Sequence, residues 1–273
     1  MDLNNPPTLQ EGDTGQPVAF LQKQLNKQGA SLDADGVFGP ATEAAAMAFQ
    51  RRAGLVVDGI VGAKTWAALQ GWDCSRLLKE RDLIKAAEIL GVELAAIKAV
   101  NEVESRGTGF LSNGKPDLLF ERHVMYRRLQ AVNPQRADKL ATQHPNLVNP
   151  KPGGYAGGAA EYQRLARARL IDNDIALESA SWGLYQIMGF HWEHLGYDSV
   201  QAYADAMHKS EREHLKAFVG FIRANPKLHQ TLRGKKWGQF ARIYNGPNYK
   251  RNLYDVKLAR AYQRHLGAAE AAA

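Results

Sequence analysis

The sequence has a single cysteine, Cys74, among its 273 residues. One cysteine excludes an intramolecular disulfide and a zinc site built from several thiolates, and Cys74 lacks the surroundings of a catalytic cysteine. A histidine-based zinc site is also disfavoured, because His191, Glu193 and His194 do not form the His-Glu-x-x-His pattern. We therefore expect neither a metal nor a cofactor.

Long apolar segments are also lacking. No apolar run reaches the roughly 18 residues that cross a bilayer. The first residues include Asp2, Asn4, Asn5 and two prolines, and they lack the basic and apolar regions of a secretory signal peptide. We expect a protein that is made in the cytoplasm and stays there until another component releases it.

Charge is unevenly distributed along the chain. Residues 1–72 contain 5 Lys and Arg against 7 Asp and Glu, whereas residues 73–273 contain 30 against 21. Residues 208–273 alone contain 14 basic and 4 acidic side chains, which favours an anionic partner. Nucleic acid is disfavoured because no recognised binding motif accompanies this charge. The basic segment 251–266 has two interpretations, weak contact with an anionic membrane or packing on its own domain, and we favour packing.

An eight-residue pattern occurs twice near the start of the chain. Its copies are Asp35-Gly-Val-Phe-Gly-Pro-Ala-Thr42 and Asp58-Gly-Ile-Val-Gly-Ala-Lys-Thr65, 23 residues apart. Asp-Gly favours a tight turn, and the second glycine favours the start of a helix. Each copy therefore predicts a turn that leads into a helix. Val18, Leu21 and Leu25 predict an earlier helix by their spacing.

From Leu9 to Leu69 the chain resembles the three-helix peptidoglycan-binding domain found in many bacterial and phage wall hydrolases. The residues that carry the resemblance include Gly12, Gly15, Val18, Leu21-Gln22, Leu25, Gly29, Phe49-Gln50 and both repeat copies. It implies peptidoglycan as a partner and a wall-binding role for the repeat residues Asp35, Gly36, Gly39, Thr42, Asp58, Gly59, Gly62 and Thr65. The alternative is that the repeat serves only the architecture of a small helical bundle.

The remaining sequence predicts a second, larger domain. We place the first domain at residues 1–72, a linker at 73–84 and the second domain at 85–273. Apolar spacing predicts helices at 80–90, 93–105, 158–170, 200–223 and 250–266. Leu118-Leu119-Phe120 predicts a short strand, and the segments 107–121 and 144–158, rich in Gly, Pro and Asn, favour a small hairpin. The expected fold class is mainly α, a three-helix bundle followed by a larger α-rich domain with a small hairpin.

The segment from Ile97 to Gly107 contains two glutamates on a helix that ends at a glycine. Glu104 falls on the apolar face, whereas Glu102 points to the polar side. Desolvation and the negative end of the helix dipole both disfavour an ionised Glu104, so we expect its carboxyl to stay protonated near neutral pH. A glycosidase requires such a group as its general acid. The alternative is a buried, paired glutamate that stabilises the fold.

Three motifs in order strengthen this interpretation. They are Glu104-Ser105, the segment from Ser181 to Gly189, and the segment from Ala241 to Gly246. Their order resembles the lysozyme-like fold of goose-type lysozymes and soluble lytic transglycosylases. The resemblance implies that Glu104 is the catalytic acid and that Tyr185, Gln186, Tyr244 and Asn245 lie on the substrate side.

Residues 85–268 resemble more closely the N-acetylmuramidase domain of modular phage endolysins. The matching segments are Val103-Glu104-Ser105-Arg-Gly107-Thr-Gly109-Phe110 and Leu119-Phe120-Glu121-Arg122-His123. The resemblance implies a glycoside hydrolase that cleaves the β-1,4 bond between N-acetylmuramic acid and N-acetylglucosamine. It also implies release to the periplasm and cell wall through a pore formed by another phage protein. We expect a monomer.

Glu121 is the natural second carboxylate, able to activate water or to stabilise positive charge on the sugar ring. The alternative is an ion pair with Arg122 or another basic residue. Asp117 ranks behind Glu121, because a residue that follows a proline more often starts a turn or strand. Ser105 and Thr108 are expected to position the acid or a water by hydrogen bonding, and Ser105 is also a candidate substrate-binding residue. The alternative is that these helix-end hydroxyls satisfy backbone groups, as they do more often.

Four glycines surround Tyr155, as Gly153-Gly154 and Gly157-Gly158. They lack the preceding strand and the Lys-Ser/Thr of a phosphate-binding loop. They indicate a mobile loop that carries Tyr155.

Two other functions stay open at this point. A lytic transglycosylase would use the same acid with the 6-hydroxyl of muramic acid as nucleophile and would leave 1,6-anhydro ends. A non-catalytic wall-binding protein of the phage particle would keep the first domain and need no acid.

Overall fold

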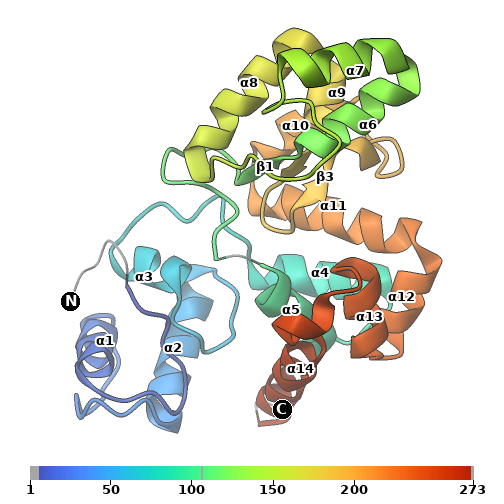
Figure 1. The fold of residues 1–273 in the computed structure, drawn as a ribbon. Helices are drawn as coiled ribbons and strands as arrows, with labels where there is room; N and C mark the ends of the chain where they lie inside the picture. Colours follow the sequence, from blue (N-terminus) through green and yellow to red (C-terminus); the bar gives the residue numbers. More distant parts are fainter. Residues whose placement is uncertain (1–5, 106, 272–273) are drawn as a thin grey trace. The chain divides into compact units, whose positions relative to one another are not determined.

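The computed structural model describes residues 6–105 and 107–271. Residues 1–5, on which the expectation of a missing signal peptide rests, lie outside the described residues, as do 106 and 272–273. The described chain has fourteen α-helices and one three-stranded sheet (Figure 1), so the mainly α fold class is confirmed. Packing divides the chain into a first unit, Met1–Thr108 with Thr231–Ala273, and a second unit, Gly109–Gln230.

The predicted three-helix bundle opens the first unit. Its helices are α1 (Gln16–Lys27), α2 (Pro40–Ala53) and α3 (Ala63–Leu69). Pro40 occupies the first turn of α2, where a missing backbone N–H costs nothing. The apolar stripe of α1 packs with Phe38 and Trp66 in one small core. The bundle therefore has the helices and turns that the sequence predicts.

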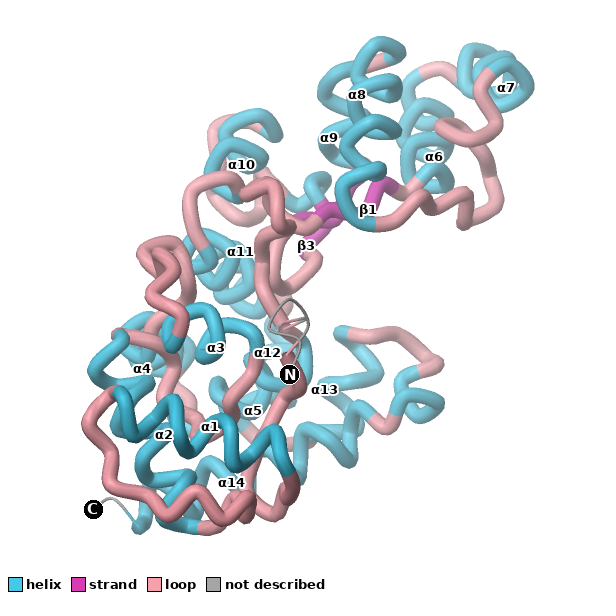
Figure 2. The backbone as a smooth tube through the Cα atoms, turned by 90° about the vertical axis from the view of Figure 1, so that its left-hand side faces the viewer, coloured by secondary structure: helices cyan, strands magenta, loops and turns pink. Residues whose placement is uncertain are grey.

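The rest of the first unit is built from both ends of the remaining sequence. It contains α4 (Glu80–Leu90), α5 (Leu94–Glu104), α13 (Trp237–Tyr244) and α14 (Tyr254–Ala271). Helix α14 packs along α5, and Figures 1 and 2 show the two helices side by side. The helix predicted at 250–266 begins later, because a 3-10 turn over Tyr249–Asn252 ends at Leu253, whose φ is 54°.

The predicted linker, residues 73–84, is packed. It includes the fully buried Leu78 and the first turn of α4, where Asp82 is also buried. The predicted domain limits themselves, 1–72 and 85–273, stay a prediction.

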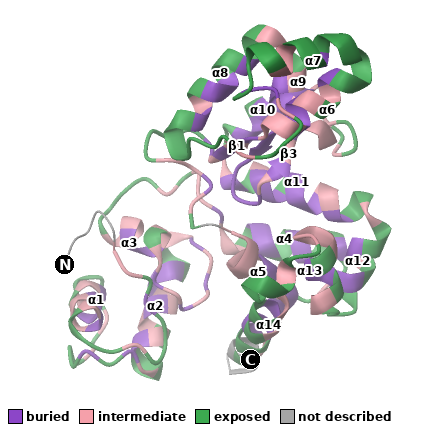
Figure 3. Cartoon of the chain, in the orientation of Figure 1, coloured by how far each residue is buried: buried purple, intermediate pink, exposed green. Residues whose placement is uncertain are grey.

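The second unit contains α6 (Arg122–Val132), α7 (Pro134–Gln143), α8 (Glu161–Ile171), α9 (Asn173–Glu178), α10 (Val200–Met207) and α11 (Glu211–Ala224). Helix α12 (Pro226–Arg233) has residues in both units. Figure 3 shows that α11 is largely buried, whereas α7 is mostly exposed. Helix α11 is therefore a central element of this unit.

One predicted helix is wrong. The sequence pattern over 200–223 predicts a single helix, but the chain forms α10 and α11 with a break before Ser210. Ser210 has an extended backbone, with φ −166° and ψ 162°, as the residue before the first turn of α11. Serine favours this position, and the carbonyl of Ser210 accepts from the backbone N–H groups of Glu213 and His214. The apolar spacing continues across the break and conceals it.

The sheet has the order β1-β2-β3 with antiparallel pairs. Strand β1 (Leu118–Phe120) is the predicted strand, but its partner is β2 (Ala180–Trp182), which then pairs with β3 (Ile187–Met188). The small hairpin expected in segments 107–121 and 144–158 is confirmed only in the first segment, where Phe110 and Pro116 form an antiparallel bridge. Residues 144–158, all of them described, contain no strand.

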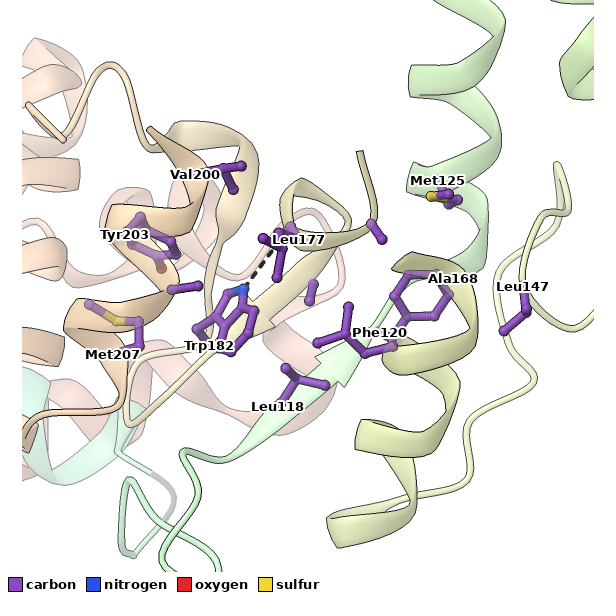
Figure 4. Packing of buried hydrophobic residues seen from close by; sticks show 14 of the residues in the cluster. Leu118, Phe120, Met125, Leu147, Ala168, Leu177, Trp182, Val200, Tyr203 and Met207 are labelled. Atoms are coloured by element: carbon purple, nitrogen blue, oxygen red, sulfur yellow. Dashed lines mark hydrogen bonds between the residues drawn. The ribbon is translucent and has the colours of Figure 1, made fainter. Parts of the chain in front are cut away.

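The sheet sits in the main core of the second unit. Phe120 and Trp182 are almost completely buried, together with residues from α8, α9 and α10 (Figure 4). The indole N–H of Trp182 donates a hydrogen bond to the carbonyl of Leu177 over 3.3 Å, which satisfies its polar atom inside the core. This core fixes the end of β1, where Glu121 follows.

Candidate active site

In the first repeat copy, the motif side chains bond to one buried glutamine. The amide nitrogen of Gln22 donates to Asp35 Oδ1 over 2.8 Å and to Thr42 Oγ1 over 3.1 Å. Its amide oxygen accepts from the backbone N–H of Gly36 over 3.0 Å. Gly36 has φ 75°, and an added Cβ would lie 3.0 Å from the carbonyl oxygen of Gly15. The turn therefore requires glycine for its own geometry.

The second copy repeats this arrangement around Gln50. Its amide nitrogen donates to Asp58 Oδ1 over 2.8 Å and to Thr65 Oγ1 over 3.2 Å, and its oxygen accepts from Gly59 N over 3.0 Å. Gly39 and Gly62 directly precede α2 and α3 with extended backbones, as predicted. The Asp and Thr side chains of both copies thus stabilise the module, as in the architectural alternative, and their contact with the wall stays a prediction.

The two aspartates of the repeat differ in their surroundings. Backbone and side-chain hydrogen bonds from Val37 and Gln22 lower the pKa of the solvent-exposed Asp35. Burial raises the pKa of Asp58, with His265 and Glu102 among the charged groups that act on it. The loop that leads into the second copy is bonded to α5, where Lys98 donates to the carbonyl of Val57 over 2.7 Å, whereas Asp35 of the first copy is exposed.

Glu104 is the last residue of α5 and is half-buried. Its Oε2 accepts a hydrogen bond of 2.8 Å from the side-chain amide of Asn245, which directly follows α13. Glu104 and Asn245, which belong to two separate sequence motifs, are thus in contact within the first unit. Tyr244, beside Asn245, stacks on Phe240 with ring centroids 5.8 Å apart. Ser105 has an extended backbone and donates its N–H to the carbonyl of Asn101 over 3.0 Å.

The carboxylate of Glu102 forms ion pairs with Arg264 and His265. Its carboxylate accepts from His265 Nε2 over 2.9 Å and from the Arg264 guanidinium. Burial raises the pKa of Glu102, but the hydrogen bonds from His265 and Arg264 outweigh burial, so its pKa lies below the ordinary value. This agrees with the placement of Glu102 and Glu104 on different faces of the helix.

Glu121 lies in the second unit, between the end of β1 and the start of α6. Its Oε2 accepts a hydrogen bond of 2.8 Å from the Tyr155 hydroxyl, and His123 Nδ1 lies 3.1 Å from the same oxygen. Its backbone N–H donates to the carbonyl of Ser179 over 2.9 Å. Asp117 is bonded at the other end of β1, where its carboxylate accepts from Leu118 N over 3.0 Å.

The alternative for Glu121, an ion pair with Arg122 or another basic residue, is wrong for Arg122 only. The Arg122 guanidinium donates instead to the carbonyls of Pro145, Lys151 and Pro152, over 2.9 to 3.2 Å. The basic residue beside Glu121 is His123. Arg122 therefore anchors the glycine-rich loop that carries Tyr155.

Glu161 anchors the other end of that loop, although no sequence motif pointed to it. It is fully buried, accepts from the backbone N–H groups of Ala156 and Gly157, and pairs with Arg164 Nη1 over 2.6 Å. Arg164 Nη1 also donates to the carbonyl of Phe120 over 3.0 Å. The pair thus ties the Tyr155 loop to β1. A possible signal was the Glu-x-x-Arg spacing at the start of α8.

The segment from Ser181 to Gly189 forms β2, a turn and β3. Gln186 has φ 50°, and its side-chain amide donates to the carbonyl of Gly183 over 2.8 Å while accepting from Ser181 Oγ over 2.9 Å. Tyr185 is 3% exposed and stacks on Phe218 at 4.5 Å. Both side chains are bonded or packed within the second unit, and their predicted contacts with substrate stay predictions.

The imidazole ring of His214, which is buried in α11, lies against two glycines of the sequence motifs, Gly109 and Gly183. His214 Nδ1 accepts from Leu184 N over 3.1 Å, and Nε2 lies 2.7 Å from the carbonyl of Met207. A Cβ added at Gly109 or Gly183 would come within 2.5 or 2.6 Å of His214 Nδ1. The absence of a side chain at Gly109 and Gly183 therefore leaves the space that the imidazole ring occupies.

We expect Gly183→Ala to destabilise the second unit by about 2–4 kcal/mol, because the new methyl group overlaps His214 and the φ of 69° strains any L residue. Gly107→Ala is the matched control, since Gly107 has φ 77° but nothing within 4 Å of an added Cβ. Urea denaturation of both variants measures the difference. Equal losses in the two variants would contradict the steric explanation.

Comparison with known proteins agrees with these observations. Residues 93–266 match the N-acetylmuramidase family, and residues 14–69 match the family described as putative peptidoglycan binding domain. The crystal structure of a Burkholderia AP3 phage endolysin superimposes with a TM-score of 0.90 at 54% identity, covering 95% of this chain and 99% of that one.

Two curated relatives match shorter stretches. A zinc D-Ala-D-Ala carboxypeptidase of Streptomyces albus G is 45% identical over 74 residues, which cover 25% of this chain and 29% of the relative. An uncharacterized protein in the bpoA1 3' region of Kitasatospora aureofaciens is 48% identical over 65 residues, 23% of this chain and 55% of the relative. The chain thus spans only part of the length of these two relatives.

The chain belongs to the N-acetylmuramidase family of peptidoglycan hydrolases and carries a peptidoglycan-binding domain ahead of its muramidase domain.

Proposed function

We propose that this protein hydrolyses the β-1,4 bond between N-acetylmuramic acid and N-acetylglucosamine in peptidoglycan, with Glu104 as general acid. The observation that carries the proposal is the 2.8 Å hydrogen bond from Asn245 to Glu104 Oε2, at the end of α5. The match to the N-acetylmuramidase family over residues 93–266 supports the substrate and the bond.

The Asn245 contact gives the two oxygens of Glu104 different roles. An amide N–H donates, so Oε2 acts as the acceptor whether the carboxyl is ionised or protonated. In the protonated acid the proton therefore resides on Oε1, from which it passes to the oxygen of the departing sugar. Asn245 thus orients the acid for proton transfer as the glycosidic bond breaks.

Glu121 supplies the second carboxylate in this proposal. Ionised, it either takes a proton from the attacking water or stabilises the positive charge that develops on the sugar ring. Tyr155 and His123 both approach its Oε2 and hold the carboxylate in one orientation. Burial and the hydrogen bond to Glu121 raise the pKa of Tyr155, so its hydroxyl remains a donor at neutral pH.

The test is mass spectrometry of the fragments released from purified peptidoglycan, before and after borohydride reduction. Reducible muramic acid ends are expected from a muramidase. Ends with 1,6-anhydro-muramic acid would show a transglycosylase and remove the need for Glu121. Reducible glucosamine ends, or no glycan cleavage, would overturn the proposal.

Tyr155→Phe should lower kcat about tenfold with little change in KM, because the ring remains while the hydrogen bond that orients Glu121 is lost. Tyr126→Phe is the matched control, since Tyr126 donates to Asp138 over 2.7 Å on the exposed surface of α6. Initial rates on solubilised glycan strands measure both variants. An unchanged kcat in Tyr155→Phe would show that Glu121 does not depend on this contact.

We also propose that the N-terminal module holds the enzyme on peptidoglycan and thereby raises the local concentration of glycan.

By its likeness to a phage endolysin, the chain is proposed to work at the host wall as a monomer, after release through a separate pore. Within the described residues, none of the helices is both long and apolar enough to cross a membrane. Light scattering after gel filtration measures the molar mass and so tests the monomeric state. Fractionation of an infected culture shows in which cell compartment the protein lies.

Weak contact with anionic lipid through the basic C-terminal region is part of the same proposal. Leu253 and Val256 are exposed near the start of α14, and basic side chains flank them. Co-sedimentation with vesicles that contain phosphatidylglycerol should be lost when Lys257 is changed to Glu. Equal sedimentation of both proteins would contradict this contact.

A further inference from the structure

A cavity of about 490 Å³ lies within the first unit, away from the Glu104 contact. Its walls come from the end of α2, the loop that follows, the first turns of α4 and α5, and His265 of α14. Apolar side chains form part of the lining, including Met47, Leu55 and Leu94. The volume is in the range of small-ligand sites.

The charged lining of this cavity is predominantly basic. Arg51, Lys79, Arg81 and Lys98 line it, against the single carboxylate of Glu80. Lys98 Nζ pairs with Glu80 Oε1 over 2.6 Å, so these two charges compensate each other. For the other three cations, the described part of the chain shows no ion pair. A ligand that brings carboxylates would therefore meet uncompensated positive charge.

The walls are joined by hydrogen bonds across the loop after α2. Lys98 Nζ donates to the carbonyl of Val57 over 2.7 Å, and the backbone N–H of Val57 donates to Glu80 Oε2 over 3.0 Å. The backbone N–H of Glu80 donates to the carbonyl of Leu55 over 3.3 Å. The cavity is thus preformed, with the repeat module on one side and the start of α4 and α5 on the other.

We propose that this cavity binds the stem peptide of peptidoglycan through its carboxylates. The proposal rests on the proposed function, which supplies peptidoglycan as the substrate. Where a stem peptide is attached, the lactyl carboxyl of muramic acid is bound in an amide and carries no charge, so the negative charge of such a strand lies mainly on the peptide carboxylates. A short peptide fits a cavity of this size, with its carboxylates at the cations and its alkyl groups on the apolar lining.

Binding is tested with the full chain carrying Glu104→Gln, so that the ligand is not cleaved. Calorimetry compares a disaccharide with its tetrapeptide against the same disaccharide without peptide. Adding Arg51→Gln and Arg81→Gln should weaken binding of the peptide-bearing ligand about tenfold, because two charged donors are lost. The peptide-free disaccharide should bind equally well, or equally poorly, to both proteins.

The matched control is Arg52→Gln with Lys85→Gln, which removes the same charge from α2 and α4 outside the cavity lining. Arg52 donates to the carbonyl of Gln28 over 2.9 Å, and Lys85 pairs with Glu88 over 3.1 Å. Equal affinities of the two double variants would overturn the proposal. Inorganic phosphate is then added at matched ionic strength to compete with the peptide-bearing disaccharide. If phosphate displaces this ligand as effectively as excess ligand does, the cavity is a general anion site, and the proposal is also overturned.

Cleavage separates this proposal from the proposed function. With Glu104 intact, Arg51→Gln and Arg81→Gln should leave the cleavage of peptide-stripped glycan at the wild-type rate while slowing cleavage of intact wall. If the wild type cleaves neither substrate, the proposed function fails. If it cleaves both and the double variant matches its control on intact wall, only the peptide site fails.

Discussion

Glu104→Gln should reduce the release of reducing ends from purified peptidoglycan by about a thousandfold, because general acid catalysis contributes about 10²–10⁴ to such reactions. The glutamine keeps a carbonyl oxygen that accepts the hydrogen bond from Asn245, so the local structure is retained while the proton is lost. Sedimentation of the variant with insoluble wall should equal that of the wild type. The measurement is the initial rate of reducing-end formation at neutral pH.

Glu102→Gln provides the matched control two residues away on the same helix. Because Glu102 pairs with Arg264 and His265, its replacement should lower the melting temperature but leave kcat near that of the wild type. A Glu104→Gln enzyme within a fewfold of the wild-type rate would remove Glu104 as the acid. A folded Glu102→Gln enzyme without activity would reverse the assignment.

Helical periodicity predicted that these two glutamates have different surroundings, although both side chains are half-buried in the structure. The spacing from Ile97 to Glu104 predicted different faces for Glu102 and Glu104, and the structure gives the two carboxylates different partners. The repeated Asp-Gly turns were equally informative, since both copies form the predicted turn and helix start. Local patterns predict well where the determining interactions lie within one or two turns of the chain.

Local sequence patterns did not predict the contacts between segments that are distant in the chain. Strand β1 pairs with β2 about 60 residues later, and neither strand is long enough to show an alternating pattern. The apolar spacing over 200–223 is continuous although the helix breaks before Ser210, because both helices bury apolar side chains. The contact of Asn245 with Glu104 joins residues 141 positions apart, and only the family resemblance brought them into one site.

Glu161 shows the same limit, because its importance comes from burial that the sequence does not display. Its carboxylate is fully buried and bonds to Arg164 and to three backbone N–H groups, those of Phe120, Ala156 and Gly157. A glutamate in the first turn of an amphipathic helix would ordinarily be assigned to solvent. Its role follows from the β1 and loop backbone that folding brings to it.

Glu161→Gln should destabilise the second unit by about 3–5 kcal/mol, since removing one partner leaves the charge of the buried Arg164 uncompensated. The loop that carries Tyr155 should loosen at the same time, because its backbone N–H groups bond to Glu161. Chemical denaturation measures the loss of stability, and hydrogen exchange of the loop amides measures its opening. Glu88→Gln is the matched control, because Lys85 and Glu88 have the same spacing but an exposed pair, which is worth about 0–1 kcal/mol.

The stabilisation by Glu161 should depend on pH in a defined direction. Burial raises the pKa of Glu161, but the N–H groups of Gly157 and Ala156 and the Arg164 guanidinium together outweigh burial, so the folded pKa lies below 4.5. A carboxyl with a depressed folded pKa stabilises fully above its unfolded pKa, and this contribution is lost as the pH falls through the folded value. The difference in stability between wild type and Glu161→Gln should therefore be largest near neutral pH and shrink below about pH 4.5. A difference that stays constant into the acid range would show that Glu161 acts through shape rather than through its charge.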